Sequence, residues 1–126
     1  MEIDIKKLKP IASFKDLRVW QEGIVLVKDI YLLCKKLPQD ELYTLASQMK
    51  RAAISVPSNL AEGHSRNHRA EYRQSVFVAV GSLAELETQL CLAQELKLID
   101  EEELVPVFAR MNRLRAMLIT LGKKLS

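Results

Sequence analysis

A chain of 126 residues is long enough to bury one hydrophobic core and fits a single domain of ordinary size. With 48% hydrophobic and 28% charged residues it falls among globular proteins, which excludes the disordered and collagen-like classes. The net charge of +3 permits an acidic partner without requiring one. Leu, Ala, Glu, Lys and Gln dominate while Gly and Pro are few, so the composition favours helices, and strands are not expected.

The N-terminal segment differs from the rest of the chain. Residues 1–12 contain three lysines without helical periodicity and include Pro10, so they are expected to form a flexible arm. Residues 13–126 are expected to form one helical domain. Ser13, followed three residues later by Asp16, resembles a capping box and predicts that the first helix starts there.

The first helix is expected to contact neighbours on two sides. Apolar residues at spacings of three and four define two adjacent stripes along it. The stripes are Leu17, Trp20, Ile24, Val27, Tyr31 and Cys34, and beside them Val19, Gly23, Leu26, Ile30, Leu33 and Leu37. A helix with so narrow a polar face suits a bundle or an oligomer.

A second helix is predicted between a residue that starts helices and one that ends them. Asp40 is expected to cap its N-terminus, an apolar stripe runs to Leu60, and Gly63 is expected to end it. Pro57 lies inside this pattern and cannot donate a hydrogen bond to the carbonyl of Ala53. We therefore expect a kink or a break near Ala53.

Two further helices complete the expected fold. Asn67 is predicted to cap the third, whose apolar stripe spans 72–93, and Asp100 to cap the fourth, whose stripe spans 104–125. Pro106 would also fit the first turn of the fourth helix, so its start is open by several residues. Short connections imply antiparallel neighbours, so the sequence predicts an all-α, up-down-up-down four-helix bundle.

Signals of catalysis and of metal binding are not found in the sequence. His64 and His68 fall across a predicted loop and helix start, and the Glu-x-x-His motif of di-iron bundles is missing, so neither a metal nor a cofactor is expected. Cys34 and Cys91 lie in apolar patterns and are expected to be reduced core thiols. Neither a phosphate-binding loop, a signal sequence nor a membrane-spanning stretch is evident. These features predict a cytoplasmic protein that is not an enzyme and does not contact a membrane.

A row of polar residues follows the second helix and faces a matching row on the third. The row on the second helix is Gln48, Arg51, Ser55, Asn59 and Glu62, and the row on the third that could face it is Ser75, Ser82, Glu85 and Gln89. They could line a binding cleft or form a buried network that sets helix register and oligomer geometry. We favour the network, because no nucleophile, base and oxyanion donor recur together, and we expect Arg51 to pair with Glu85 or Glu62.

Basic residues gather at two places in the sequence and form the candidate nucleic-acid-binding set. They are Arg66, Arg69 and Arg73, and Arg110, Arg113, Arg115, Lys123 and Lys124. The last 23 residues from Leu104 contain no Asp or Glu, so this segment carries +5. Phe108 is its only aromatic residue, so phosphate contact with little sequence preference is expected. The alternative is that these basic residues only form solvated helix faces and do not bind nucleic acid.

Residues 55–63, Ser-Val-Pro-Ser-Asn-Leu-Ala-Glu-Gly, resemble a motif of the proteins encoded in intervening sequences of bacterial 23S ribosomal RNA genes. The resemblance covers most of the chain and includes further ordered signatures on both sides. These are Phe14, Leu17, Val19-Trp20-Gln21, Gln48-Met49-Lys50-Arg51-Ala52-Ala53, Arg66, Glu71, Phe77, Gly81-Ser82-Leu83 and Glu85-Leu86. Val56 and Leu60 stand where the family often has Ile.

This resemblance implies a homopentamer of antiparallel four-helix bundles with no known enzymatic activity. It also implies a distant relation to the accessory variability proteins of diversity-generating retroelements, which bind nucleic acid and a reverse transcriptase. We therefore expect a ring-shaped homo-oligomer that binds RNA or DNA, most plausibly structured RNA, with a reverse transcriptase as a partner if the chain is associated with a retroelement. The alternative is a protein-interaction scaffold that does not bind nucleic acid.

Overall fold

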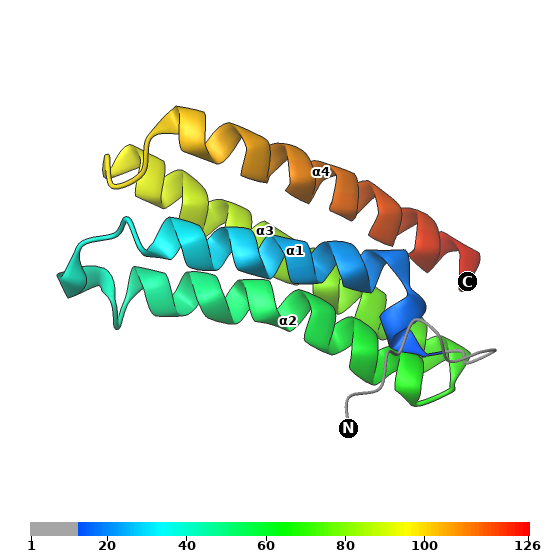
Figure 1. The fold of residues 1–126 in the computed structure, drawn as a ribbon. Coiled ribbons are helices and arrows are strands. Elements are labelled where there is room, and N and C mark those ends of the chain that lie inside the picture. Colours follow the sequence, from blue (N-terminus) through cyan, green and yellow to red (C-terminus); the bar gives the residue numbers. More distant parts are fainter. Residues whose placement is uncertain (1–12) are drawn as a thin grey trace, which may run out of the picture.

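The computed structural model describes residues 13–126, and within that range the chain is helical and has no strand. The arm expected over residues 1–12 lies outside the described residues. Four long helices and two short 3-10 turns follow one another along the chain (Figure 1). Their bounds are η2 Phe14–Asp16, α1 Arg18–Cys34, η3 Gln39–Glu41, α2 Leu45–Ser65, α3 Arg69–Glu95 and α4 Glu101–Lys124.

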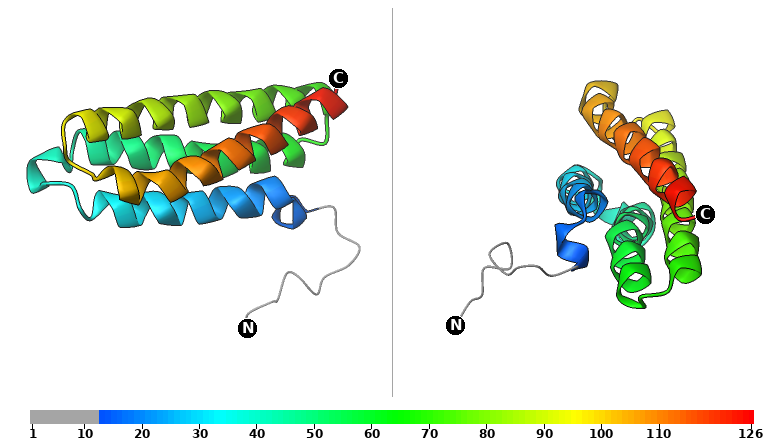
Figure 2. Two further views of the ribbon diagram at one scale, coloured as in Figure 1. Left: turned by 90° about the horizontal axis from the view of Figure 1, so that it is seen from above. Right: turned by 90° about the vertical axis from the view of Figure 1, so that its right-hand side faces the viewer.

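The four helices lie around a common core. The α1–α2 and α3–α4 connections lie at one end of the molecule, and the α2–α3 connection lies at the other end with the end of α4 (Figure 1). Seen end-on, α1 lies beside α2 and α4 beside α3 (Figure 2). The most extensive contact is between α2 and α3. The structure is therefore a four-helix arrangement, as the apolar stripes predict.

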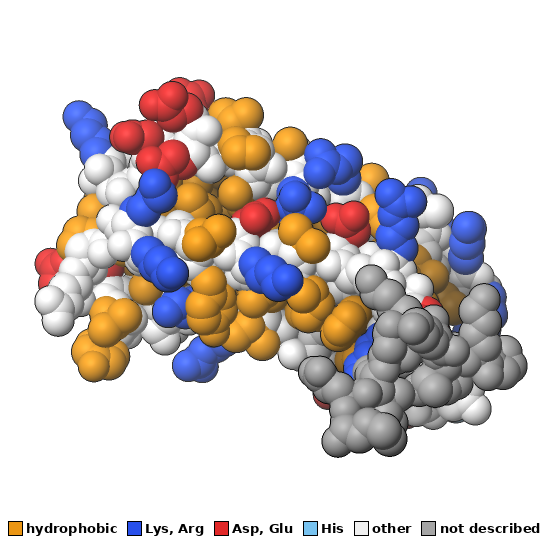
Figure 3. Space-filling view, viewed as in Figure 1, with side chains coloured by type: hydrophobic (Ala, Val, Ile, Leu, Met, Phe, Trp, Pro, Cys, Tyr) orange, Lys and Arg blue, Asp and Glu red, His pale blue; other side chains and the backbone are white. Residues whose placement is uncertain are grey.

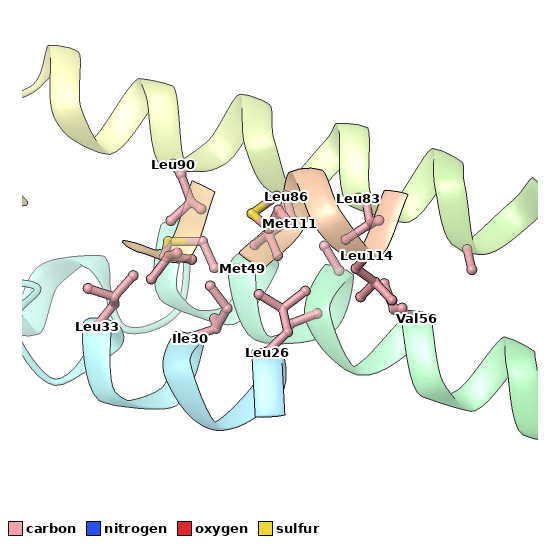
Figure 4. Packing of buried hydrophobic residues seen from close by; sticks show 14 of the residues in the cluster. Leu26, Ile30, Leu33, Met49, Val56, Leu83, Leu86, Leu90, Met111 and Leu114 are labelled. Carbon is pink, nitrogen blue, oxygen red and sulfur yellow. The ribbon is translucent and has the colours of Figure 1, made fainter. Parts of the chain in front are cut away.

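The predicted apolar stripes of α2, α3 and α4 supply most of the core, whereas in α1 one stripe is largely buried and the other only in part. The stripe that begins at Val19 faces inward, and Tyr31 in the other stripe is 41% exposed. Figure 4 shows how side chains from all four helices meet between them. The labelled core residues are Leu26, Ile30, Leu33, Met49, Val56, Leu83, Leu86, Leu90, Met111 and Leu114.

The first helix starts later than its capping signal predicts. Ser13 does act as a cap, because its hydroxyl accepts a hydrogen bond from the Lys15 N–H at 3.2 Å, but it caps the short turn η2. Leu17 then has an extended backbone, with φ −72° and ψ 126°, and α1 begins at Arg18. A capping motif marks the start of a helical turn, and only longer-range packing decides whether that turn continues.

The start of α2 was also predicted wrongly. Asp40 lies in η3, and α2 begins at Leu45 after Thr44. The Thr44 hydroxyl donates to the Glu41 carboxylate at 2.8 Å and makes no capping bond to α2. The polar residues of this connection therefore hydrogen-bond to one another, so their capping propensity does not mark the helix start.

Pro57 does not break α2, which continues past Gly63 to Ser65. The ring of Pro57 is buried and packs against Gly23 of α1, where an added Cβ would lie 3.4 Å from Pro57 Cβ. Tertiary contact on this face compensates for the hydrogen bond that proline cannot make. The predicted break is therefore wrong, and the helix is continuous.

Asn67 connects two helices and does not cap the second. It has a φ of 54°, a left-handed conformation that Asn tolerates better than most residues, and its N–H donates to the His64 carbonyl at 3.3 Å. The N-cap of α3 is His68. Asp100 is the N-cap of α4 as predicted, although its side chain makes no capping bond, and α4 runs unbroken through Pro106.

The two cysteines have different surroundings. Cys34 is buried, and its thiol lies 3.8 Å from the Ala46 carbonyl. Burial raises the pKa of the Cys34 thiol, and the nearby Lys50 opposes this in part. Cys91 is exposed on α3. The core-thiol prediction is confirmed for Cys34 and is wrong for Cys91.

One helix among the described residues, α3, is long and apolar enough to cross a membrane by length and composition alone. Core helices of globular proteins meet the same criterion, and α3 contributes seven buried residues to this core. Only 39% of its apolar window is buried within the chain. The large hydrophobic side chains that α3 leaves exposed in the single chain are Val78 and Leu92.

Candidate nucleic-acid interface

The first basic group of the sequence meets the two C-terminal lysines of the second group at one end of the molecule. The Arg69 guanidinium donates to the Lys124 carbonyl, and Arg73 Nε donates to Ser126 Oγ at 3.1 Å. The Arg73 guanidinium also lies over the Phe77 ring, 4.9 Å from its centroid. These contacts hold the start of α3 against the end of α4. We call the resulting surface the basic end, formed by Arg66, Arg69, Arg73, Lys123 and Lys124.

Most cations of the basic end are not paired with a carboxylate among residues 13–126. Arg69 and Arg73 bond to a carbonyl and a hydroxyl, which are neutral, and Lys123 and Lys124 are exposed. Arg66 pairs with Glu62 at 2.9 Å, but both side chains are more than half exposed, and such pairs contribute little. Among residues 13–126 this surface therefore carries exposed positive charge that is largely unpaired.

Two other predicted arginines are engaged by carboxylates from neighbouring helices. Arg110 bonds to Asp29 Oδ2 at 2.8 Å and to Glu22 Oε2 at 3.1 Å, both on α1. Arg115 pairs with Glu87 of α3. These three carboxylates lie on other helices, so a count of charge within the last helix overstates the positive potential there. Arg113 is exposed, and no ion pair involves it among residues 13–126.

Charge is divided between the two ends of α4. Glu101, Glu102 and Glu103 occupy its first turn, while Lys123 and Lys124 occupy its last turn. Acidic side chains gather over the start of α4 in Figure 3, and basic side chains lie along the remainder. This order complements the helix dipole and also separates an acidic end of the molecule from the basic end.

The centre of the predicted polar network lies between α2 and α3. Ser55 Oγ and Ser82 Oγ are 2.8 Å apart, and Asn59 Nδ2 donates to the Ser55 carbonyl at 2.7 Å and to its hydroxyl at 2.9 Å. Ser82 Oγ also lies 3.2 Å from the Val78 carbonyl. Ser82 is 8% exposed, so this hydrogen bond is made where water competes little.

The outer members of that row do not join the network in the single chain. Gln48, Arg51, Glu62 and Glu85 are exposed. The expected ion pair of Arg51 is wrong, because Glu62 pairs with Arg66 and Glu85 accepts from Gln89 at 3.4 Å. The two residues of each pair are four apart on one helix. Glu62 and Glu85 therefore pair within their own helices and not with Arg51.

A direct comparison of two substitutions tests whether the network contains Ser82 and excludes Arg51. Ser82→Ala is expected to lower the free energy of unfolding by about 1 kcal/mol, because it leaves Ser55 without its cross-helix partner. Arg51→Ala is expected to change it by less than about 0.5 kcal/mol, because an exposed side chain is removed. Urea unfolding of both variants at one protein concentration measures the difference. A larger loss for Arg51→Ala than for Ser82→Ala would contradict this assignment.

An open pocket of about 710 Å³, which sequence reasoning missed, adjoins the basic end. Its lining includes Phe14, His64, His68, Arg69 and Tyr72. His64 and His68 are the sequence feature that points to this pocket, but they were considered only as metal ligands. Within residues 13–126 no three His, Cys, Asp or Glu side chains are grouped closely enough to hold a metal ion.

These features define a four-helix domain whose candidate site is a basic surface at one end. The chain belongs to the 23S rRNA-intervening sequence protein family, whose model matches residues 15–120. The resemblance found in the sequence is thereby confirmed. No curated protein matches the chain significantly.

A solved structure has the same fold. It is the crystal structure of a protein with unknown function from the S23 ribosomal protein family of Bacteroides thetaiotaomicron VPI-5482. It is 21% identical, covers 83% of this chain and 98% of its own, and has a TM-score of 0.77. At this level of identity the similarity shows the shared fold alone.

Proposed function

We propose that this protein is a non-catalytic, homo-oligomeric helical bundle that binds structured RNA through phosphate contacts at the basic end. The observation that carries the proposal is the pair of contacts from Arg69 and Arg73 to the last residues of α4. They bring cations more than fifty residues apart in sequence onto one surface. Such a surface neutralises phosphates and releases counterions, which favours binding to any dense polyanion.

Assembly is the second part of the proposal. We infer an up-down-up-down bundle that associates as a ring of five chains in the cytoplasm. Support comes from α3, on which Val78 and Leu92 are 46% and 47% exposed and lie fourteen residues apart on one face, with Glu85 between them. Rotational symmetry would place every basic end on the same face of the ring, so weak single contacts would sum by multivalency.

The same two exposed side chains support a second candidate function, a protein-interaction scaffold. Val78 and Leu92 could contact another protein in place of a second copy of this chain, and a reverse transcriptase would be such a partner in a retroelement. A scaffold of this kind would not require the basic end. The two functions therefore differ in whether loss of Lys123 and Lys124 changes binding.

Charge reversal at the basic end is expected to weaken RNA binding. Lys123→Glu with Lys124→Glu should reduce affinity for a structured RNA by about 10- to 100-fold, because repulsion replaces phosphate contact. The matched control is Lys28→Glu with Lys35→Glu, which changes net charge equally at exposed positions on and just after α1 and should cost less than about 3-fold. Fluorescence anisotropy with labelled RNA and duplex DNA measures both.

Salt dependence separates the two candidate functions. Affinity of the parent protein should fall steeply between about 50 and about 200 mM salt if several phosphates are contacted. RNA binding that is absent at low salt, or that responds to neither salt nor the Lys123 and Lys124 substitutions, would reject the nucleic-acid proposal. The scaffold function would then be the better account.

A further inference from the structure

The pocket beside the basic end has the size and position of a ligand site. It lies between η2, the α2–α3 connection and the end of α4, with Ser13, Asn67 and Leu125 contributed by these three segments. Its volume of about 710 Å³ is within the range of small-molecule sites and accommodates a nucleotide. Arg69 belongs both to its lining and to the basic end.

Aromatic rings in this pocket are held in place by other rings. Phe14 packs edge-to-face on Trp20, with centroids 5.4 Å apart, and Tyr72 packs on His64 at the same distance. Phe14, Tyr72 and His64 all line the pocket. Rings ordered in this way provide surfaces on which a nucleic-acid base can stack, whatever its identity.

Tyr72, which lines the pocket, also has a polar atom whose bonding is incomplete. The Tyr72 hydroxyl is buried and has no hydrogen-bond partner among the described residues. Burial raises the pKa of Tyr72, so the hydroxyl remains a protonated donor at neutral pH. A buried hydroxyl without a partner is unfavourable, and a ligand that presents nitrogen or oxygen acceptors would satisfy it.

Negative charge is favoured at one side of the pocket. α3 begins there, and its N-cap, His68, makes no side-chain capping bond, so that side chain leaves the first N–H groups of the helix free. Arg69, the first residue of this helix, also lines the pocket, and its guanidinium donates to the Lys124 carbonyl. Free helix N–H groups and an arginine together suit a phosphate.

We propose that this pocket holds an unpaired nucleotide of the bound RNA, with the base against Phe14 and Tyr72 and its phosphate at Arg69. This inference rests on the proposed function and narrows it to RNA with an unpaired nucleotide next to a helix. It also changes the expectation from the sequence, where only the last helix was considered and base stacking was not evident. The rings come from η2, α2 and α3, which the fold brings to the end of α4.

Two RNA duplexes of equal length, one fully paired and one with a single bulged nucleotide, test the inference. The parent protein should bind the bulged duplex about 10-fold more tightly. Phe14→Leu should remove that preference and leave affinity for the paired duplex unchanged. Tyr43→Leu is the matched control, because Tyr43 is an aromatic residue 87% exposed in the α1–α2 connection, and it should keep the preference.

A second measurement does not depend on RNA binding. Trp20 is the only tryptophan in the chain, and its ring contacts Phe14, so its fluorescence reports on the pocket. Uridine monophosphate should change this fluorescence saturably in the parent protein, and Tyr72→Phe should weaken the response about 5-fold or more. Inorganic phosphate at equal concentration should have little effect.

The outcomes separate this inference from the proposed function. Salt-dependent binding of both duplexes with equal affinity, and no fluorescence response to the nucleotide, would overturn the pocket and leave the basic end as the RNA site. A saturable nucleotide response without binding of either duplex would support the pocket and reject the proposed function. A response to inorganic phosphate equal to that for the nucleotide would overturn the nucleotide assignment.

Discussion

Gly63→Ala is expected to lower the free energy of unfolding by about 2 to 3 kcal/mol, because the new methyl group has no room. A Cβ built at Gly63 would lie 2.4 Å from Ser75 Cβ and 2.5 Å from Ser75 Oγ. Ser75 Cβ is fixed to the backbone of α3, so relief requires that α2 and α3 move apart. These two helices make the most extensive contact in the fold, so the cost spreads through the core.

Gly81→Ala serves as the matched control for Gly63→Ala. Both glycines are in helix interiors, but a Cβ at Gly81 would have no atom of this chain within 4 Å. Alanine there should stabilise the helix by about 0.5 to 1 kcal/mol through its higher propensity. Thermal and urea unfolding at equal protein concentration compare the two. Equal effects at both positions would contradict the packing account, and recovery of stability in Gly63→Ala with Ser75→Gly would support it.

Substitution of the two exposed apolar side chains on α3 is expected to dissociate the assembly. Val78→Glu with Leu92→Glu places two carboxylates on a surface that, in the proposed ring, is buried against another chain. Burying a charge without a partner costs several kcal/mol, so at micromolar concentration the variant should be a monomer. Light scattering should give the parent protein a mass of several chains and the variant the mass of one.

The fold of this variant should survive, because neither side chain is part of the core. Circular dichroism should show helix content equal to that of the parent protein. Val105→Glu is the control, since Val105 is an apolar residue 57% exposed on α4 and not on α3. Dissociation by Val105→Glu and not by the α3 substitutions would place the interface on α4. A parent protein that is itself monomeric at micromolar concentration would reject the ring.

Helix identity was predictable because the relevant signal is local. Apolar residues at spacings of three and four identified the core faces of α2, α3 and α4, and Asp100 was correctly identified as the cap of α4. Helix boundaries were predicted wrongly where a polar residue could form its hydrogen bond in more than one turn. Ser13 caps η2, and Asn67 takes a left-handed conformation between α2 and α3. Both residues show their usual preferences, but the chain uses them in turns outside the long helices.

The candidate site was predictable in composition and not in arrangement. All eight basic residues were identified from sequence, yet the structure assigns Arg110 and Arg115 to ion pairs with α1 and α3. Of the other six, five form the basic end, because Arg69 and Arg73 contact Lys124 and Ser126. Pairing of charge between helices depends on which faces meet, and no periodicity within one helix contains that information.

The sequence by itself therefore determined an all-helical chain, the inward faces of its helices and membership of the 23S rRNA-intervening sequence protein family. These properties depend on the order of residues within single helices and within one continuous motif. Only the tertiary structure decided that Arg51 is exposed, that Pro57 is accommodated against Gly23, and that a pocket adjoins the basic end. Each of these depends on distances between segments far apart in the chain, and those distances are set by how the four helices pack.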